Sequence, residues 1–404
     1  MLLKIAWRNI WRSRTRSIVI IIAVSLAVWA TIALLSFSFG FVKSYVDNAV
    51  EHNTSHLQVH DSLYLENNEV QYYMNFNDTR FDEIMQIPEV KAGAYRSIVL
   101  GMVGNSKGSR GLQIKGVAPQ LEDSLTGLSG MITAGDYFSS KGKNQILIGS
   151  KLAKKMGVKL RSKVVLTFQN LNGDMTAGAF RVKGFYSTKN DFNDNAIVFV
   201  KRSDLNRLLG NDAVVHEMAF LLKNQKDLST VQSKIQRLLP EEKVSTYREI
   251  SPDVNLYETQ MLSNVNIFIA IVMLALVFGL INTMLMAVLE RYRELGVLMA
   301  VGMNRLRVFG MIFYETIMLT TVAAIPGLIA GWLTVMYFGN YGLDLSAFSS
   351  GMEKFGLASI VYPTLEGEIY FRMALAVWIT AVVASVYPAW KAVRLRPVEA
   401  IRKL

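Results

Sequence analysis

The stretch that decides the fold is Glu290-Arg-Tyr-Arg-Glu-Leu-Gly-Val-Leu-Met-Ala-Val-Gly302, which carries both signs of charge between two long apolar runs. A charge near the centre of a bilayer costs about 3 kcal/mol or more, so this segment lies outside the lipid if the runs beside it span a membrane. Its pattern is that of a short amphipathic helix, with apolar residues set against Arg and Glu. Such a helix suits docking to another protein better than exposure to solvent alone.

The composition is that of a membrane protein with a substantial polar part. The 404 residues are 51% hydrophobic and 19% charged, with a mean hydropathy of +0.27, whereas soluble domains are roughly 25% charged. The chain has no cysteine, which excludes disulfides and thiolate metal sites. The net charge of +11 comes largely from Lys4, Arg8, Arg12, Arg14 and Arg16 before the first apolar run and Lys391, Arg394, Arg396, Arg402 and Lys403 after the last. Basic residues in these places follow the positive-inside rule and do not indicate a nucleic-acid partner.

Four apolar runs are long enough to cross a bilayer, which takes about 20 residues. The first run is too long for a signal peptide and has no clear cleavage site, so we expect it to remain as a span. The predicted segments are an amphipathic helix over 1–17, spans over 18–41, 263–289, 309–338 and 371–390, a large domain over 42–262, a charged helix over 290–308, a short loop over 339–370 and a tail over 391–404.

The basic residues of the short segments predict the orientation. The amino terminus, the 290–308 segment and the carboxyl terminus are rich in Lys and Arg, whereas the 339–370 loop has only Lys354. Four spans place the three basic segments on one side. We therefore expect both termini in the cytoplasm of a bacterium, the spans in its inner membrane, and residues 42–262 outside the cytoplasm.

The large insert has mixed patterning. Alternating or β-rich runs predict strands over 56–60, 97–103, 164–168 and 196–200, and apolar periodicity predicts helices over 81–87, 150–156, 203–209 and 228–239. Ser251 and Pro252 are typical of a helix start, and that helix is expected to run into the second span. The predicted fold class is an α-helical membrane protein with four transmembrane helices and a large α+β extracytoplasmic domain, carried on helical stalks between the first and second spans.

Several motifs, in this order along the chain, resemble those of a known family. They are Ala6-Trp-Arg-Asn-Ile-Trp-Arg12, Ile148-Gly-Ser-Lys-Leu-Ala-Lys-Lys-Met-Gly157, Arg181-Val-Lys-Gly-Phe185, the 290–302 segment, Tyr387-Pro-Ala-Trp-Lys-Ala392 and Arg396-Pro-Val-Glu-Ala-Ile-Arg402. The family comprises the ABC transporter permeases related to LolC, LolE, MacB and FtsX, also called type VII or mechanotransmitting permeases. The likeness covers nearly the whole chain.

The resemblance implies that the 290–308 segment is a coupling helix seated in an ATPase. The residues expected to make this contact are Glu290, Arg291, Arg293, Glu294, Leu295, Gly296, Leu298 and Gly302. Two positions depart from the family pattern, because Met299 stands where an Arg is usual and Met303 where an Ala is usual. The first departure removes a cation that could pair with the ATPase.

The chain has no phosphate-loop motif of the form G-x-x-x-x-G-K-[ST]. We therefore expect no enzymatic site and no cofactor in this chain, with ATP and Mg²⁺ bound by a separate ATPase subunit. His52, His56 and His60 have helical metal-site spacing. The alternation of residues 56–60 favours a solvated stalk end and a strand instead, and we predict no metal.

The resemblance favours a permease that extracts lipoproteins from the inner membrane for delivery to the outer membrane. The alternatives are MacB-like efflux of peptides or small hydrophobic compounds and FtsX-like activation of a cell-wall hydrolase without transport. The expected partners are two ATPase subunits, a second copy of the permease or a homologue, the lipid bilayer, and a periplasmic carrier, adaptor or effector. Residues near the outer surface that line a lateral opening, or alternatively pack in the core, are Phe37, Phe39, Phe41, Met261 and Leu262.

Three local features carry further expectations. Glu315 in the third span either pairs with an Arg of the amino-terminal helix or faces lipid headgroups, and pairing is favoured because intramembrane acids usually face the bundle interior. Arg8, Arg12 and Arg16 recur every four residues and predict one basic stripe on a helix at the membrane surface. Gly327, after Pro326, and Gly331 predict close helix packing in the third span.

Overall fold

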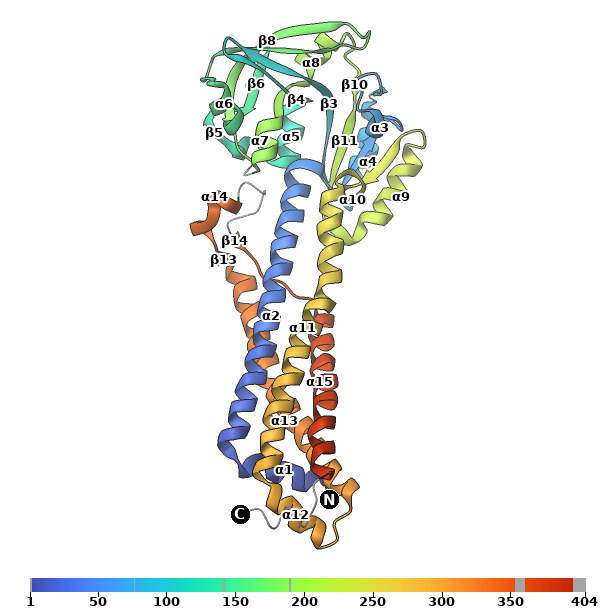
Figure 1. Cartoon of the computed structure of the whole chain (residues 1–404). Coiled ribbons are helices and arrows are strands. Elements are labelled where there is room, and N and C mark those ends of the chain that lie inside the picture. The colour runs from blue at the N-terminus through green and yellow to red at the C-terminus, as the bar shows by residue number, and fades with distance from the viewer. Residues whose placement is uncertain (1, 76, 141, 189, 353–359, 395–404) are drawn as a thin grey trace. The chain divides into compact units, whose positions relative to one another are not determined.

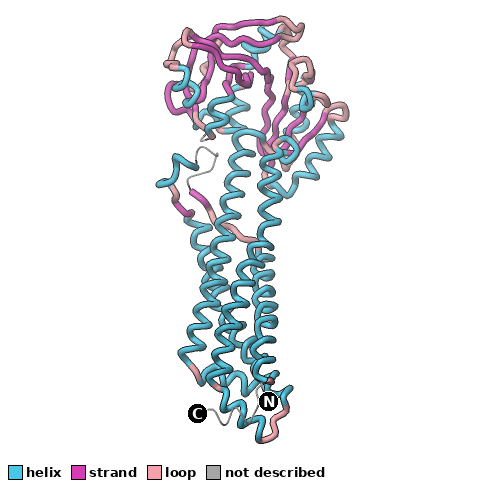
Figure 2. The backbone as a smooth tube through the Cα atoms, in the orientation of Figure 1, coloured by secondary structure: helices cyan, strands magenta, loops and turns pink. Residues whose placement is uncertain are grey.

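The computed structural model describes residues 2–75, 77–140, 142–188, 190–352 and 360–394, apart from the side chains at 2–5, 262 and 348–350. The chain forms two compact units (Figure 1). The helix bundle comprises Met1–Val42, Thr259–Asp344 and Val361–Leu404, and the sheet domain comprises Lys43–Glu258 and Leu345–Ile360. Figure 2 shows long helices in the first unit and the strands gathered in the second.

The bundle is built from α1 (Leu2–Arg12), α2 (Arg14–Ala49), α11 (Pro252–Glu290), α12 (Tyr292–Ala300), α13 (Arg305–Tyr341) and α15 (Gly367–Val393). Among the described residues, four of these helices are long and apolar enough to span a membrane, namely α2, α11, α13 and α15. The number of spans and the insertion of a large α/β domain between the first two confirm the predicted fold class. Both α2, with 36 residues, and α11, with 39, are much longer than the roughly 20 residues that a span needs.

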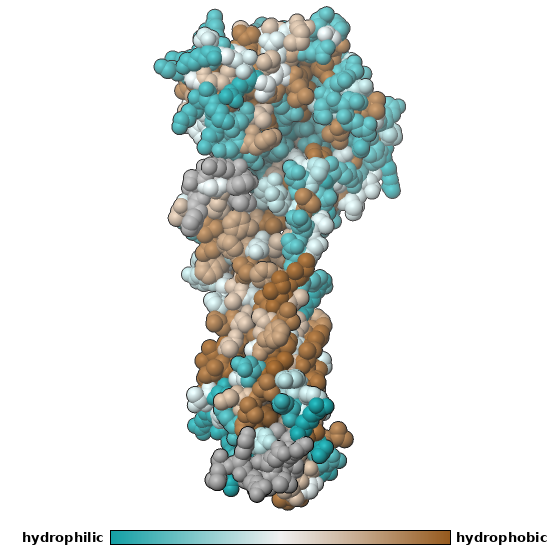
Figure 3. Space-filling view, viewed as in Figure 1, coloured by the Kyte–Doolittle hydropathy of each residue, from teal (hydrophilic) through white to brown (hydrophobic). Residues whose placement is uncertain are grey.

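The bundle helices are apolar on both their inner and outer sides. Val28, Ala323 and Met373 are fully buried in the bundle core, whereas Ile22, Phe278 and Trp332 are more than half exposed in the chain by itself. Figure 3 shows this apolar surface along the bundle and a mostly polar surface on the sheet domain. An apolar outer surface is what a helix needs when its surroundings are lipid.

Small residues allow α2 and α13 to approach closely, as predicted. A Cβ atom on Gly327 would lie 2.6 Å from the carbonyl oxygen of Ser25, and one on Gly331 would lie 2.8 Å from the side chain of Ile32. The hydroxyl of Ser25 also donates to the carbonyl oxygen of Ala323 at 2.6 Å. Despite Pro326, α13 is one continuous helix, so this part of the third span serves packing.

The strands of the sheet domain are β1 (Leu57–His60), β2 (Met74–Asn75), β3 (Val90–Asn105), β4 (Gly108–Val117), β5 (Ile132–Gly135), β6 (Gln145–Gly149), β7 (Lys163–Gln169), β8 (Met175–Tyr186), β9 (Ile197–Lys201), β10 (Val214–Val215), β11 (Glu217–Leu222) and β12 (Lys243–Thr246). Ten of them form one mixed sheet in the order β12-β1-β11-β3-β4-β9-β6-β8-β5, with β7 paired to β3 and β8. The two short strands β2 and β10 pair with each other.

Helical and turn segments connect these strands. They are the π-helical turn η1 (Val50–Thr54), α3 (Tyr64–Asn67), α4 (Asp78–Met85), α5 (Pro119–Thr126), η2 (Leu128–Met131), α6 (Ser150–Met156), α7 (Asp191–Ala196), α8 (Arg202–Leu209), η3 (Gln225–Asp227), α9 (Leu228–Leu238) and α10 (Tyr247–Ile250). The short elements between α13 and α15 are β13 (Leu343–Asp344), η4 (Ser346–Phe348), α14 (Ser349–Met352) and β14 (Ile360–Val361).

The predicted strands and helices of the insert all occur, with some shifted bounds. The helix expected over 81–87 begins earlier, at Asp78, because the Asn77 side chain accepts a hydrogen bond from the Thr79 amide at 3.0 Å and so caps it. The strand expected over 97–103 is the middle of the longer β3. Alternation along β7 buries Val164, Leu166 and Phe168 in the main core of the domain.

Candidate functional site

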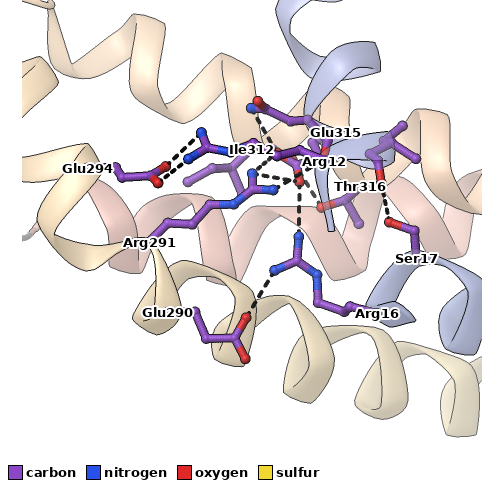
Figure 4. Close-up of polar contacts among 11 residues, drawn as sticks. Arg12, Arg16, Ser17, Glu290, Arg291, Glu294, Ile312, Glu315 and Thr316 are labelled. Atoms are coloured by element: carbon purple, nitrogen blue, oxygen red, sulfur yellow. Dashed lines mark hydrogen bonds and ion pairs between the residues drawn. The ribbon is translucent and has the colours of Figure 1, made fainter. Parts of the chain in front are cut away.

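A buried carboxylate joins the helices at one end of the bundle. Glu315 of α13 is 4% exposed, and its Oε1 atom lies 3.2 Å from the Arg291 guanidinium and 3.6 Å from that of Arg16 (Figure 4). The side-chain amide of Asn9 in α1 donates to the other carboxylate oxygen at 3.4 Å. The expected pairing of Glu315 with an Arg of the 1–17 segment is therefore confirmed for Arg16, although Arg16 lies in α2. We call Asn9, Arg16, Arg291 and Glu315 the charge cluster.

Arg291 occupies the break between two helices. Helix α11 ends at Glu290 and α12 begins at Tyr292, so the Arg291 side chain turns back toward the bundle. Besides Glu315 it reaches α1, where its Nη2 atom donates to the carbonyl oxygen of Asn9 at 3.1 Å. One guanidinium thus ties the start of α12 to α1 and α13. Because both ions are mostly buried, removing Glu315 would leave the charge of Arg291 uncompensated, whereas removing Arg291 would leave Glu315 with Arg16 alone.

The amino-terminal segment is an elbow of two helices, so the prediction of one basic stripe over Arg8, Arg12 and Arg16 is wrong. Helix α1 ends at Arg12 and α2 begins at Arg14. The Ser17 hydroxyl donates to the carbonyl oxygen of Ile10 at 2.5 Å across this elbow, which satisfies a carbonyl that the end of α1 would otherwise leave open. Arg16 therefore belongs to α2 and points into the charge cluster.

A second ion pair connects α1 and α12 near the surface. The guanidinium of Arg12 forms two hydrogen bonds with the carboxylate of Glu294 (Figure 4). The Arg12 side chain is 63% exposed and that of Glu294 46%, so water and salt weaken the attraction. The pair sets the direction of α12 more than it stabilises the bundle.

Seven of the eight residues predicted to contact an ATPase divide into inward and outward groups, and the eighth is Gly302, in the turn that follows α12. Arg291 is held in the charge cluster, Leu295 and Gly296 are buried in the bundle, and Glu290 and Glu294 are exposed but paired with Arg16 and Arg12. Leu298 and Arg293 face outward.

The outward surface near α12 also contains apolar residues, of which only Leu298 was predicted. Val297, Leu298, Val301 and Leu306 are all exposed, Val301 by 83% and Leu306 by 76%. We call these four residues the apolar end surface. The exposure of Val301 and Leu306 could not be read from the sequence, because it depends on the chain leaving α12 at Ala300 and starting α13 at Arg305.

Gly302 shapes that turn. Its φ angle of +98° is one that L-residues rarely adopt, and a Cβ atom there would meet nothing within 4 Å. The Asn304 side chain then caps α13 by accepting from the Leu306 amide at 3.1 Å. Gly302 is thus needed for backbone conformation, which leaves its predicted contact with a partner untested.

The residues proposed to line a lateral opening have varied surroundings. Phe37 and Phe41 form an edge-to-face pair with ring centroids 4.8 Å apart, and Phe39 packs against the bundle core, which fits the alternative of core packing. Met261 is half-buried, and the side chain of Leu262 lies outside the described residues, as does the 396–402 motif. A lining role for Phe37, Phe41 and Met261 stays a prediction.

The three histidines spaced for a metal have separate partners. His52 Nδ1 lies 3.2 Å from the carbonyl oxygen of Thr126, His56 accepts from the Leu222 amide at 3.2 Å, and His60 Nδ1 lies 2.9 Å from the carbonyl oxygen of His216. The predicted strand is present as β1. His60 at the end of this strand is only 1% exposed, because β1 lies inside the sheet.

A buried ionic network in the sheet domain escaped the sequence reasoning. Arg96 of β3 binds both carboxylate oxygens of Glu122 at 2.7 Å and contacts Glu217 on the neighbouring strand β11 at 2.5 Å. Burial would lower the pKa of the Arg96 guanidinium, but the negative charges of Glu122 and Glu217 outweigh this effect and hold the pKa above its usual value. The sequence signal was a lone Arg among apolar and small residues of a strand, at Ala94-Tyr-Arg-Ser-Ile98.

Comparison with known proteins defines the class. Residues 17–238, more than half of the chain, match the family described as "MacB-like periplasmic core domain", and residues 266–397 match "FtsX-like permease C-terminal". The chain therefore belongs to the MacB- and FtsX-like permeases of ABC transporters, as the resemblance implied. In this family the four apolar helices place the protein in the inner membrane and the permease works with an ATPase.

Three relatives illustrate the range of the family. The lipoprotein-releasing system transmembrane protein LolC of Xylella fastidiosa is 23% identical over 309 residues, covering 72% of each chain. The corresponding LolE of Haemophilus influenzae is 21% identical over 346 residues, covering 79% of each. The macrolide export ATP-binding/permease protein MacB of Chlorobium luteolum is 35% identical over 124 residues, which are 31% of this chain and 16% of that protein.

Proposed function

We propose that this chain is the permease subunit of an ABC complex that releases lipoproteins from the inner membrane, and that its ATPase docks on the apolar end surface. The observation that carries the docking site is the exposure of Val297, Leu298, Val301 and Leu306 at the end of the bundle where α12 lies. Apolar side chains gathered in this way, and rimmed by polar ones, mark a protein contact.

The charges beside this surface support a cytoplasmic partner. Arg293, Arg305 and Arg307 are exposed around it, and basic residues of short loops face the cytoplasm. They also suit a partner with acidic side chains at the rim of its binding groove. The two ATPase subunits would bind ATP and Mg²⁺, and this chain would hold no cofactor of its own.

The contacts of α12 support transmission of movement. Arg291 connects the start of α12 to Glu315 of α13 and to Asn9 of α1, so a tilt of α12 strains both neighbours. Helices α2 and α11 continue without a break beyond the length of a span, and at 1.5 Å per residue each is roughly 54 Å long or more. ATP-driven closure of the ATPases would thus move helices that lead out of the membrane.

The share of each relative that aligns with this chain favours lipoprotein release. The similarity to LolC and LolE covers more than 70% of both chains, whereas the MacB similarity covers 16% of that protein. In this account two permease chains, identical or homologous, face each other in the bilayer. Phe37, Phe41 and Met261 border the path of the lipid anchor, and a periplasmic carrier receives the cargo.

Native mass spectrometry tests this proposal. The complex is purified gently in nanodiscs, and all bound lipids and peptides are identified. A complex of two permeases and two ATPases that carries a di- or triacylated lipoprotein is the expected result. An ATPase-bound complex that retains an adaptor or a cell-wall hydrolase, and no lipoprotein, would instead establish MacB-like efflux or FtsX-like activation.

A further inference from the structure

The sheet domain contains a cavity of about 500 Å³ that the proposed function does not use. It lies where two neighbouring parallel strands end, since β4 and β9 run in the same direction and Val117 of β4 pairs with Lys201 of β9. Both residues line the cavity. In α/β sheets, ligands bind preferentially outside the carboxyl ends of parallel strands. The volume lies in the range of small-molecule sites.

Two helices begin at this cavity. Helix α5 starts at Pro119 directly after β4, and α8 starts at Arg202 directly after β9. In both helices the residue before the first turn makes no side-chain capping hydrogen bond. The amides of a helix amino terminus carry partial positive charge and favour an anion. Two such termini, together with Arg202, add positive charge to a lining that also contains one carboxylate, that of Asp212.

A lysine adds a full charge at the same place. The ammonium group of Lys201 donates to the carbonyl oxygens of Ser139 at 2.6 Å and Gly142 at 2.9 Å. Among the described residues, no carboxylate lies within ion-pairing distance of it, so its charge is held in position by neutral groups only. A bound anion would provide the missing countercharge.

A buried acceptor indicates that the ligand also donates a hydrogen bond. Asn206 lines the cavity one helical turn after Ser203 and is 1% exposed. Its amide nitrogen donates to the carbonyl oxygens of Asp212 and Val214 at 2.9 and 3.0 Å. Its Oδ1 atom is buried without a partner among the described residues, although buried polar atoms are normally satisfied. A hydroxyl group of a ligand would satisfy it.

We propose that this cavity is a binding site for a small hydroxylated anion, in which a phosphate or carboxylate group meets Lys201 and the two helix termini and a neighbouring hydroxyl group donates to Asn206. The hydroxyls of Ser139, Ser140 and Ser203, and the ring of Phe138, border the same space. This chemistry is found both in free phosphorylated polyols and in the headgroup of phosphatidylglycerol. The site belongs to the sheet domain alone and does not depend on the cargo or the ATPase.

Saturation-transfer NMR with sn-glycerol 3-phosphate, on the full chain in phosphatidylcholine nanodiscs, tests the proposal. We expect saturable binding, at least tenfold weaker in Lys201→Met and unchanged in Lys226→Met, an exposed lysine elsewhere in the domain. Because Lys201 also holds the carbonyl groups of Ser139 and Gly142, a second variant, Ser140→Asp, places a negative charge at the exposed rim and leaves those bonds intact. It should weaken binding to a similar extent.

Comparison of probes tests the hydroxyl group and the source of the ligand. Methyl phosphate, which lacks a hydroxyl, should bind several-fold more weakly than glycerol 3-phosphate. If soluble dihexanoyl phosphatidylglycerol competes with glycerol 3-phosphate, the site accepts a lipid headgroup. If it does not compete, the site binds free polyol phosphates. The proposal is overturned if glycerol 3-phosphate gives no saturable transfer up to 10 mM, or if Lys201→Met and Ser140→Asp bind it as the unaltered chain does.

Discussion

The carboxylate of Glu315 in α13 lies 3.2 Å from the guanidinium of Arg291, the residue that separates α11 from α12. This pair connects a buried position of the third span to the segment proposed to receive the ATPase. Both partners are mostly shielded from solvent, with side chains 6% and 16% exposed. The attraction is therefore screened far less than that of the exposed pair between Arg12 and Glu294.

Replacement of Glu315 by Gln should uncouple α12 from the bundle. Arg16 and Arg291 would then face each other without the buried carboxylate between them, which costs about 3 kcal/mol or more, and Arg16 would keep only its exposed partner Glu290. We expect a lower melting temperature and a large loss of permease-stimulated ATP hydrolysis, measured on the reconstituted complex. The matched control is Glu290→Gln, because Glu290 contacts Arg16 only at 3.4 Å and is exposed. Equal effects of the two substitutions would show that the buried pair has no special role.

The effect of replacing Gly302 should depend on how readily the new residue adopts a positive φ angle. Because its φ angle is +98°, a β-branched residue strains the turn and costs about 1–3 kcal/mol, whereas Asn adopts positive φ angles more readily. Gly302→Val is thus expected to lower ATPase stimulation and the protease resistance of the turn more than Gly302→Asn. If the two variants behave alike, the backbone explanation is wrong and contact with a partner explains the glycine.

Close packing of α2 on α13 should depend on Gly327. A methyl group at this position would collide with the carbonyl oxygen of Ser25, 2.6 Å from the Cβ atom, so Gly327→Ala should destabilise the bundle by about 1–3 kcal/mol. The control is Gly279→Ala in α11, where a Cβ atom meets nothing within 4 Å. Thermal unfolding in nanodiscs should show a loss for the first variant and none for the second.

The sheet domain should lose stability as the pH falls below neutral. Burial lowers the pKa of His216 to about 4, compared with about 6.5 in the unfolded chain. Between these values the unfolded state binds more protons, so the contribution of neutral His216 is complete above pH 6.5 and is lost as the pH falls toward 4. Between pH 7 and pH 5 the loss is about 2 kcal/mol.

His216→Asn isolates this effect, because Asn can still accept the hydrogen bond that the Ile98 amide donates to His216 Nδ1 at 3.0 Å. Far-UV circular dichroism melts at pH 7 and pH 5 should show a smaller shift in this variant than in the unaltered chain. Burial also lowers the pKa of the neighbouring His60, so some dependence on pH should persist. An identical shift in both chains would contradict the assignment to His216.

The sequence predicted the spans well and the contacts at their ends poorly. The four apolar runs follow from the length that lipid demands, and the pairing of Glu315 follows from the cost of an unpaired ion. The inward turn of Arg291 depends on the helix break at that residue, and the elbow at Ser13 depends on a hydrogen bond from Ser17 to Ile10. Neither has a periodic signal, because each is one local departure from a helix.

In the sheet domain, too, the contacts between elements could not be predicted from local sequence patterns. Four of its strands and four of its helices were predicted from local patterns, but the contact of Arg96 with Glu217 requires the register of β3 against β11, in which these residues are direct partners. The cavity likewise requires β4 and β9, 80 residues apart in sequence, to be parallel neighbours. Pairings between strands so distant in sequence are set by the whole sheet.

ATP hydrolysis by the reconstituted complex, with Val301 replaced, tests the central claim most directly. Val301→Asp puts a charge in the middle of the apolar end surface, at a side chain that makes little contact within the chain, and Val301→Thr keeps the shape as a control. We predict that the Asp variant folds, inserts and loses both co-purification of the ATPase and stimulation of its activity, while the Thr variant retains most of both. Full co-purification and stimulation with the Asp variant would contradict docking at this surface.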